Sequence, residues 1–458
     1  MALKSLAFGH KMDETLKKVL KKITPTEEEY KIEKKIVELF SKKIKKFNVN
    51  PLLVGSLAKG TDLRGDKDID IFVIFPKEVD REQLEKKGLE IGTKIFKDLK
   101  IRYEIDYAEH PYVKGNYKGY DIEIVPCYYD TKLEMKSSVD RTPFHTKYVR
   151  KKIRENKKLI DEIRLLKQFM KSQNVYGAEA KVEGFSGYLT EILVIHYGSF
   201  LDVLKAASNW HFSEIIDLES QWDDNESLKY FFTNASLIVI DPVDKDRNIS
   251  AAVSRQKLAE FIIAAKEFLK NPDEEFFFKR EERVPDKKEI IKRIQKRGTK
   301  IIAISFEHKK INENTLYSQL KKTVASVQDH IEEFDFKILK SGYWTNEKNL
   351  SVLLYEFEVW SLPKIKHHVG PPIDIEPENQ EKFLEKYRED IPYIKDDHWV
   401  VDTGRECKKI EDVLPIVLKE RKGFGKDLKE VKKIYYVEGV NILRINGKEF
   451  LKFLGRFL

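Results

Sequence analysis

Two acidic residues at the head of an apolar segment are the part of the sequence best suited to chemistry. Asp68 and Asp70 flank Ile69 and lead into residues 71–75, Ile-Phe-Val-Ile-Phe. Because side chains alternate faces along a strand, both carboxylates should project to one side of a sheet and Ile69 to the other. Two carboxylates on one face can hold Mg²⁺. Such a pair at a strand edge can also be merely solvated, so the pair alone does not decide.

A glycine and a serine upstream of this pair favour the metal-site interpretation. Residues 52–54, Leu-Leu-Val, predict a strand, and Gly55 and Ser56 predict a tight turn directly after it. Such a turn lets backbone N–H groups and a hydroxyl approach nucleotide phosphates without steric hindrance. A metal and a phosphate would then meet in one cleft, and this combination outweighs the solvated alternative.

A second acidic pair supplies the further carboxylate that this chemistry needs. Asp121 and Glu123 open the segment of residues 121–127 and share one face of a predicted strand. Two-metal phosphoryl transfer uses metals about 3.5–4 Å apart to activate the attacking oxygen and to stabilise the leaving oxygen. Three converging carboxylates suit that task, although a half-exposed strand with its acids facing water explains the second pair equally well.

The composition limits the classes of protein. The chain has 458 residues, which predicts about three domains. Its 85 Lys and Arg against 77 Asp and Glu give a net charge of +8, which permits a nucleic-acid partner without requiring one. Cys127 and Cys407 are too few for a disulfide framework and lack metal-ligand spacing. We find no apolar run of transmembrane length and no signal-peptide core, so we expect a soluble, cytoplasmic protein.

The elements that must position these residues fall into three expected domains. Residues 13–46 have a helical period, and alternating strands and helices continue to about residue 129. A polar connection over residues 137–145 follows, in which Pro143 cannot continue a helix. The expected domains are a catalytic domain over residues 1–152, a mainly helical domain over residues 153–275 and an α/β domain over residues 276–458.

Helices dominate the expected second domain. Apolar residues recur at helical spacing over residues 159–170, where Lys167 borders the apolar face. Ser186 is the predicted cap of an apolar helix over residues 188–200, and another helix is predicted over residues 254–270.

The expected third domain combines strands and helices. Strands over residues 300–306 and 350–359 and a helix over residues 315–334 indicate an α/β sandwich. His367 and His368 fall in a predicted extended loop, and no carboxylate is placed to make them a convincing metal site.

With these motifs in view, the chain resembles the class I, archaeal-type CCA-adding enzymes, which are tRNA nucleotidyltransferases of the polymerase-β-like superfamily. The resemblance extends from Met12 to about Lys310 and is thinner beyond. It implies an α+β multidomain fold, with a nucleotidyltransferase mixed sheet, a mainly helical domain and an α/β sandwich that binds RNA. It also implies template-independent addition or repair of the tRNA 3′-terminal CCA with CTP and ATP, Mg²⁺ as cofactor, and a homodimer. Besides the Gly-Ser and D-x-D motifs, the matching positions are Tyr103 and residues 108–112, 125–128, 140–145, 164–167, 176–178, 184–188 and 241–244.

The resemblance implies roles for individual residues. It makes Asp68, Asp70 and Glu123 the catalytic, metal-binding carboxylates. It places Lys167 at the triphosphate and Arg247 at the Watson–Crick edges of CTP and ATP. The implied nucleotide-binding residues are Gly55, Ser56, Lys59, Thr142, His145, Lys167, Tyr176, Ala178 and Arg247.

Two positions depart from the family pattern, and several residues have ordinary alternatives. Family members commonly carry Arg at Lys59 and Asp at Glu123; a lysine cannot make the bidentate contacts of an arginine. Taken singly, His145 would be a turn histidine, Tyr176 a packing residue at a helix end, and Lys167 a lysine whose stem lies along an apolar surface. Their joint presence in the right order favours a nucleotide pocket.

RNA contacts have weaker sequence support. Basic runs at residues 42–46, 287–296 and 421–433 could follow RNA phosphates, although most such runs are solvated faces. The third domain is the better candidate for reading the shape of tRNA. Two rival functions stay open: poly(A) or oligoadenylate synthesis with the same acids, and RNA binding by a degenerate transferase domain. A tRNA substrate and a requirement for CTP would exclude the first, and the intact carboxylates argue against the second.

Overall fold

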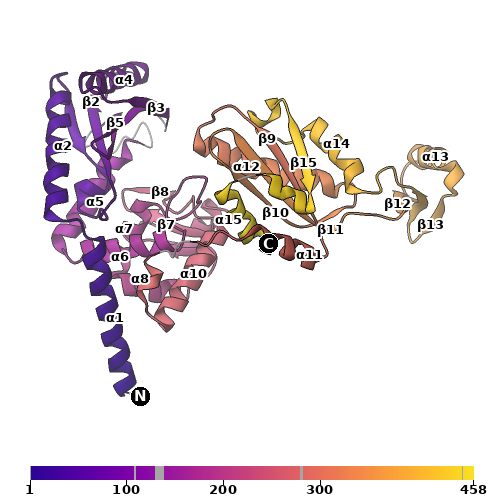
Figure 1. The fold of residues 1–458 in the computed structure, drawn as a ribbon, viewed down its shortest axis with the longest axis horizontal. Coiled ribbons are helices and arrows are strands. Elements are labelled where there is room, and N and C mark those ends of the chain that lie inside the picture. Colours follow the sequence, from indigo (N-terminus) through magenta and orange to yellow (C-terminus); the bar gives the residue numbers. More distant parts are fainter. Residues whose placement is uncertain (1, 108–109, 129–138, 279–281, 446) are drawn as a thin grey trace. The chain divides into compact units, whose positions relative to one another are not determined.

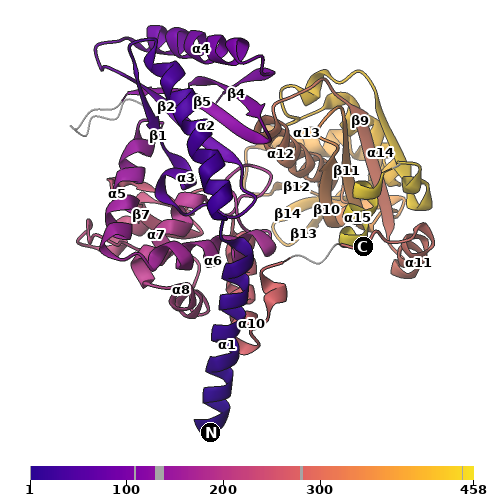
Figure 2. The ribbon, with the colours of Figure 1, turned by 60° about the vertical axis from the view of Figure 1, so that its left-hand side comes forward.

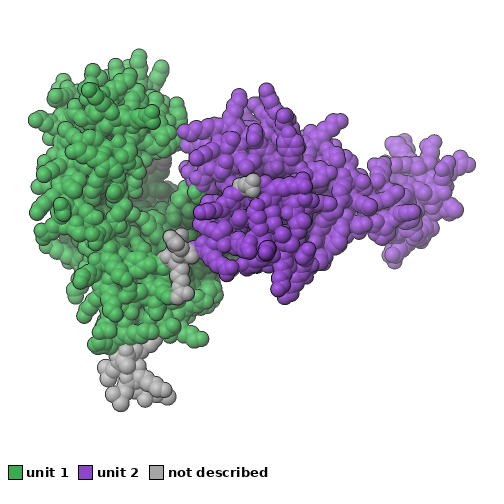
Figure 3. Space-filling model, in the orientation of Figure 1, with its two compact units in different colours: residues 1–280 green, residues 281–458 purple. Residues whose placement is uncertain are grey.

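The computed structural model describes residues 2–107, 110–128, 139–278, 282–445 and 447–458. The chain forms two compact units, Met1–Arg280 and Glu281–Leu458 (Figure 3). Residues 108–109 of one family motif and residues 137–138 of the predicted connection lie outside the described ranges. The connection also ends earlier than predicted, because a helix begins at Arg141 and holds Pro143 in its first turn, where proline is tolerated. Within those ranges, no helix combines the length and the apolar character needed to span a membrane.

A five-stranded mixed sheet forms the first half of the N-terminal unit, with strand order β1-β2-β5-β4-β3 (Figure 1). The central strands β2 and β5 are parallel, and the other neighbours are antiparallel. The strands are β1 (Asn50–Leu53), β2 (Asp68–Phe75), β3 (Tyr103–Tyr107), β4 (Pro111–Tyr117) and β5 (Tyr120–Tyr128).

Helices α2 (Glu27–Lys45) and α4 (Arg81–Asp98) cover one face of this sheet (Figure 2). Ile69 and Ile71 of β2 are buried in the core that these helices form with the sheet. Phe72 belongs to a separate apolar cluster with Val125 of β5, on the opposite face. Strand alternation therefore directs Asp68 and Asp70 away from α2 and α4, as the sequence pattern predicted.

The chain before β2 agrees with one expectation and departs from another. The helical period over residues 13–46, with residues 27–29 as a first turn after Thr26, corresponds to two helices, α1 (Ala2–Ile23) and α2. Thr26 separates them because its side chain caps α2 and exchanges hydrogen bonds with Glu29. The predicted turn at Gly55-Ser56 is the start of a short helix, α3 (Gly55–Lys59).

The second half of the N-terminal unit is mainly helical, as predicted. The expected helix over residues 188–200 is also two helices, because Gly198 ends the first with a φ of 92° and Ser199 caps the second. Ser186 caps its helix as predicted, and Ser254, the first residue of the predicted helix over residues 254–270, is the cap of the helix observed there. The elements are α5 (Arg141–Glu155), α6 (Leu159–Ser172), α7 (Gly187–Tyr197), α8 (Phe200–Ala207), β6 (Glu214–Ile216), α9 (Asn225–Phe231), β7 (Leu237–Asp241), β8 (Asp244–Asn248), α10 (Arg255–Lys270) and η1 (Glu274–Phe276).

A four-stranded sheet of order β10-β11-β9-β15 forms the centre of the C-terminal unit. Two hydrophobic cores lie on its two faces, one formed with α12 and α14 and the other with α11 and α15. This layering confirms the expected α/β sandwich. The elements are α11 (Lys287–Arg297), β9 (Lys300–Glu307), α12 (Glu313–Glu332), β10 (Lys337–Thr345), β11 (Leu350–Val359), α14 (Ile410–Glu420), η3 (Leu428–Glu430), β15 (Ile434–Glu438), η4 (Gly439–Arg444) and α15 (Lys448–Phe457).

A three-stranded sheet is inserted between β11 and α14. The extended loop expected around His367 and His368 is instead strand β12, because this segment pairs with β14 along most of its length. His367 Nδ1 lies 3.0 Å from Asp402 Oδ1 on β14. The elements are β12 (Ile365–Pro372), α13 (Pro377–Lys386), η2 (Arg388–Asp390), β13 (Tyr393–Lys395) and β14 (His398–Gly404).

Candidate active site

Four carboxylates lie on the sheet face that α2 and α4 leave uncovered. In the parallel register of β2 and β5, Asp68 lies opposite Asp121 and Asp70 lies opposite Glu123. Asp68 and Asp121 are exposed, whereas Asp70 and Glu123 are partly buried. Asp121 accepts a hydrogen bond of 2.8 Å from Asn116 Nδ2. The sheet thus brings together the three carboxylates predicted from the sequence, next to a fourth that already has a partner.

Mutual repulsion and burial raise the pKa values of these three carboxyl groups. Burial, and then the negative charge of Asp68, raise the pKa of Asp70 to about 6. Burial, and then the charge of Asp70, raise the pKa of Glu123 to about 7. Although Asp68 is open to solvent, partial burial of its carboxyl group, and then the charges of Asp66 and Asp121, raise its pKa. The cluster therefore concentrates negative charge that a cation would stabilise.

The chemistry of these donors fits a hard divalent cation such as Mg²⁺, which prefers carboxylate oxygens. Within the described ranges, no three or more His, Cys, Asp or Glu side chains are already closed around a position that could hold a metal ion. The same sheet face therefore carries Asp68, Asp70 and Glu123, whose negative charges repel one another. To bind a cation, these side chains would have to turn toward it.

Gly55 places the start of α3 against the acidic cluster. Its φ is 73°, and a Cβ atom at this position would collide with the carboxylate of Asp70. The backbone N–H of Val54 donates to the carbonyl oxygen of Asp70 at 3.1 Å, which ties the two segments together. Ser56, the next residue in α3, directly follows the glycine that packs against Asp70.

Two lysines predicted to contact the nucleotide converge on one carboxylate. Lys59 Nζ of α3 lies 2.6 Å from Glu191 Oε2, and Lys167 Nζ of α6 lies 3.2 Å from Glu191 Oε1. The hydroxyl of Thr61 also donates to Glu191 Oε1, at 2.7 Å. The side chains of Lys59, Lys167 and Glu191 are 8%, 3% and 0% exposed, so this group is almost dry. We call Lys59, Thr61, Lys167 and Glu191 the Glu191 cluster.

The ionisation of this cluster depends on its internal contacts. Burial would raise the pKa of Glu191, but the charges of Lys59 and Lys167 outweigh it and the pKa is lowered. Burial lowers the pKa of Lys59, and the attraction of Glu191 only partly offsets that effect. Lys167 itself lowers the pKa of Lys59 further by repulsion. One carboxylate therefore serves two cations.

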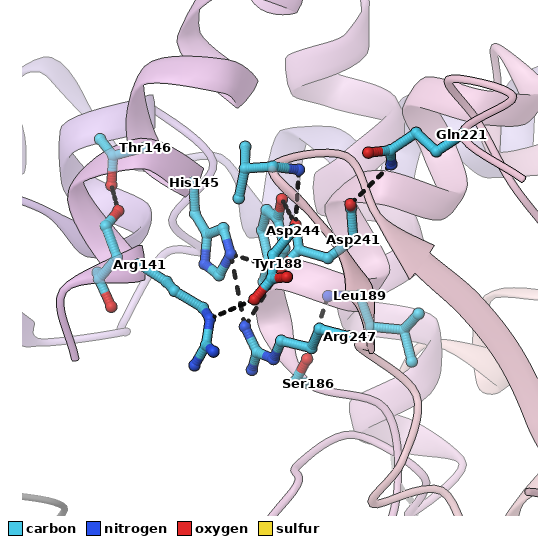
Figure 4. A network of polar contacts seen from close by, with 12 residues as sticks. Arg141, His145, Thr146, Ser186, Tyr188, Leu189, Gln221, Asp241, Asp244 and Arg247 are labelled. Atoms are coloured by element: carbon cyan, nitrogen blue, oxygen red, sulfur yellow. Dashed lines mark hydrogen bonds and ion pairs between the residues drawn. The ribbon is translucent and has the colours of Figure 1, made fainter. Parts of the chain in front are cut away.

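A second buried carboxylate, Asp241, joins His145 to Arg247 (Figure 4). His145 Nε2 lies 2.8 Å from Asp241 Oδ2, and Arg247 Nη1 donates to the same oxygen at 3.2 Å. The hydroxyl of Tyr188 donates to Asp241 Oδ1 at 3.0 Å, and its ring stacks on His145 with centroids 3.7 Å apart. Arg141 beside them pairs with Asp244 at 2.8 Å.

Asp241 determines which nitrogen of His145 carries a proton. Because an ionised carboxylate can only accept, Nε2 must donate to Asp241. Burial lowers the pKa of His145, although Asp241 opposes that shift, so the ring favours its neutral form. Neutral His145 would then present Nδ1 as an acceptor, while Arg247 can only donate.

The remaining predicted residues lie around these groups. Tyr176 pairs with Phe185 through an isolated bridge, and Lys171 Nζ lies 5.4 Å from the centre of its ring. Thr142 is in the first turn of α5, where its carbonyl oxygen accepts from Thr146. Ala178 is exposed in the loop after Tyr176.

Electrostatic interactions connect three groups of side chains: the acidic cluster (Asp68, Asp70 and Glu123), the Glu191 cluster, and the Asp241 network (His145, Tyr188, Asp241 and Arg247). Asp70 raises the pKa of Lys59 by attraction, and the charge of Lys59 lowers the pKa of His145. Carboxylates at one end can hold a cation, and buried lysines can neutralise phosphates. A histidine and an arginine can then hydrogen bond a base or a sugar. This is the chemistry of a nucleotide-binding transferase site.

Sequence reasoning missed Glu191 and Asp241 as members of the site. Glu191 is an acid within an otherwise apolar helix, and such an acid must have a partner when buried. Asp241 ends a fully buried strand immediately before Pro242. Both signals were visible in the sequence, but neither shows which cation each acid would meet.

Comparison with known proteins gives matches along most of the chain. Three family models match consecutive parts of the chain: a nucleotidyltransferase domain at residues 29–160, the second domain of tRNA nucleotidyltransferase at residues 161–278, and the C-terminal domain of CCA-adding enzyme at residues 297–438. The chain is 40% identical to a CCA-adding enzyme of Methanocaldococcus jannaschii over 88% of this chain and 90% of that protein. It is 35% identical to a CCA-adding enzyme of Methanosarcina mazei over 96% of this chain and 97% of that protein.

Proposed function

Because the chain belongs to the archaeal CCA-adding enzymes, a family of tRNA nucleotidyltransferases, we propose that its acidic cluster is the centre where CMP and AMP are transferred to tRNA. The protein acts on tRNA with CTP and ATP. In each step the RNA 3′-hydroxyl oxygen forms a bond to the α-phosphorus, and the bond from that phosphorus to the bridging oxygen breaks to release pyrophosphate.

Asp68, Asp70 and Glu123 would hold Mg²⁺. When bound, the ion supplies charge stabilisation at the phosphate and lowers the pKa of the attacking hydroxyl. The observation that carries this assignment is the parallel register, which sets Asp70 against Glu123 on a face where burial, and then mutual repulsion, raise the carboxyl pKa values. Glu123 is one methylene longer than the aspartate common in the family and can reach the same position by changing its rotamer.

The chain's other residues bind and orient the nucleotide. Lys59 and Lys167 take the triphosphate, because buried ammonium groups neutralise phosphate oxygens strongly in a dry site. Arg247 and His145 face the base or sugar, and Tyr176 packs beside the sugar. We assign Gly55 and Ser56 to the phosphates as well, and Thr142 and Ala178 to the rim of the same pocket.

We also propose the organisation of the whole molecule. Residues 1–152 carry the chemistry, residues 153–275 bind the nucleotide and primer, and residues 276–458 bind tRNA. The protein acts as a homodimer in the cytoplasm. The family resemblance supports the dimer, and light scattering on the purified chain measures it.

Incorporation of labelled CTP and ATP into a tRNA transcript lacking CCA tests the proposal. Asp70→Asn should abolish addition of both nucleotides and leave tRNA binding intact, because one centre serves both. The matched control is Asp121→Asn, which removes a carboxylate from the same sheet face, at a position bonded to Asn116, and should retain activity. Loss of CMP addition alone, or equal loss in both variants, would contradict the assignment. ATP-only extension by the unmodified protein would favour poly(A) synthesis instead.

A further inference from the structure

Glu191 has no assigned role, yet it is fully buried and touches both lysines proposed for the triphosphate. The two oxygens of its carboxylate have different partners. Oε2 pairs with Lys59, while Oε1 accepts from Thr61 and pairs with Lys167. Lys167 Nζ also donates to the carbonyl oxygen of Thr61 at 3.1 Å. The carboxylate thus accepts hydrogen bonds from two ammonium groups and one hydroxyl, and these contacts fix the positions of both lysines.

Two buried ammonium groups near each other are unfavourable without a counter-charge. Desolvation disfavours the charged form of each lysine, and repulsion between them adds to that cost. A neutral lysine would lose the charge that attracts phosphate. A flexible charged lysine would have to be ordered when the nucleotide arrives, at a cost in affinity.

We propose that Glu191 is a positioning residue that holds Lys59 and Lys167 charged and in place for the nucleotide triphosphate. This inference rests on the proposed function of the two lysines. Because one negative charge balances two positive charges, the cluster keeps a net positive charge that the triphosphate can neutralise. CTP and ATP share the triphosphate, so Glu191 should affect both nucleotides equally.

Other titratable groups face this cluster, and they are the same in the wild type and in the Glu191 variants. Asp70 acts on Lys59 from β2, and Lys59 acts on His145 of α5. The negative charge of Glu191 contributes to raising the pKa of Tyr176 and of Tyr188. The positive charge of Lys167 opposes the rise in the pKa of Asp62, which is next to Thr61. None of these groups contacts both lysines, so removal of Glu191 leaves the pair without a shared counter-ion.

The test is equilibrium binding of CTP and of ATP to Glu191→Gln between pH 6.5 and pH 9. Each dissociation constant is divided by the wild-type value at the same pH, which cancels the titration of the triphosphate itself. Burial already lowers the pKa of Lys59 and Glu191 opposes that shift, so without Glu191 Lys59 should lose its proton at lower pH. The ratio should therefore rise about tenfold from pH 7 to pH 9, equally for both nucleotides. Glu191→Asp keeps the charge and should restore a nearly flat ratio. Affinity for tRNA should stay unchanged.

Glu162→Gln is the matched control, because Glu162 on α6 accepts from the backbone N–H of Phe200 at 2.8 Å and touches neither lysine. Its ratio should be flat across pH. A flat ratio for Glu191→Gln as well would overturn the proposal and make Glu191 a packing residue. If Lys59→Gln and Lys167→Gln bind CTP normally, the failure lies in the proposed function of the lysines instead.

A second variant keeps the test decisive if Glu191→Gln does not fold. Thr61→Val removes the hydroxyl that donates to Glu191 and keeps every charge. It should weaken CTP and ATP binding by about threefold each, which corresponds to the loss of a modest hydrogen bond. Unchanged nucleotide affinity in folded Thr61→Val would overturn the positioning role.

Discussion

Alanine substitutions at Gly55 and at Gly60, the glycines at the two ends of α3, distinguish the effect of backbone strain from the effect of displacing a carboxylate of the acidic cluster. Gly55 and Gly60 flank this helix with nearly equal φ angles, 73° and 72°. An alanine at either position must adopt the left-handed conformation, at a cost of about 1–2 kcal/mol. For a unit of this size that cost lowers Tm by roughly 2–8 °C. The two variants should therefore lose similar stability.

Their activities should differ strongly. A Cβ at Gly60 meets no atom within 4 Å, whereas a Cβ at Gly55 collides with the carboxylate of Asp70. Gly55→Ala must displace either Asp70 or the start of α3, so we expect about a hundredfold loss of kcat for CMP addition, typical of a misplaced catalytic group. Gly60→Ala should stay within about threefold of the unmodified protein, because its added methyl group meets open space.

Differential scanning fluorimetry and single-turnover addition to a tRNA lacking CCA measure both quantities. Comparable activity loss in the two variants would refute the reasoning, because strain alone would then explain the effect. Full activity of Gly55→Ala would show that Asp70 is not needed where this structure places it.

Three further predictions concern other parts of the chain. Arg247→Ala should allow UTP or GTP to compete with CTP and ATP, measured by misincorporation, because its guanidinium would no longer reject mismatched polar groups; equal loss for all nucleotides would make Arg247 a structural or phosphate residue. Lys432→Glu with Lys433→Glu alters a cavity of about 680 Å³ that Lys309 also lines, and should weaken tRNA binding and reduce its salt slope by about two; an unchanged slope would place the RNA surface elsewhere. Arg297→Met leaves the buried Glu356 without its ion pair and should cost about 3 kcal/mol at pH 7.5 in calorimetry. Since burial opposes but Arg297 lowers the pKa of Glu356, this pair stabilises the fold above the unfolded pKa near 4.3 and loses that effect in acid, so the difference should shrink toward pH 4.

Local sequence chemistry predicted much of the fold. The cap at Ser186 was predictable because a side-chain oxygen needs only the N–H groups of its own next turn, and Thr26 and Ser254 cap their helices in the same way. The alternation of β2 placed its acids on one face for the same local reason. The break between α7 and α8 was missed, although its cause is also local: Gly198 ends the first helix and Ser199 caps the second.

Nonlocal pairing explains the other errors. Strand β12 contains Gly370, Pro371 and Pro372, which predict a loop when read alone. Its hydrogen bonds go to β14, and no pattern within β12 identifies that partner. Pairing between distant segments overrides local preference because it satisfies backbone groups that would otherwise need water.

The two buried acids show a deeper limit of motif reasoning. Residues expected to touch the nucleotide, such as Lys59 and Arg247, were identified through the family resemblance. Their counter-ions, Glu191 and Asp241, lie on other elements and would meet no nucleotide directly. A basic side chain in a dry pocket must be protonated before the nucleotide binds. The acidic residue that stabilises its charge can lie on any helix or strand that reaches it. The nucleotide therefore determines where a lysine or arginine must lie, whereas the fold determines which acidic residue lies beside it. For this reason the pairing of each basic residue with its buried acid becomes visible only in the structure.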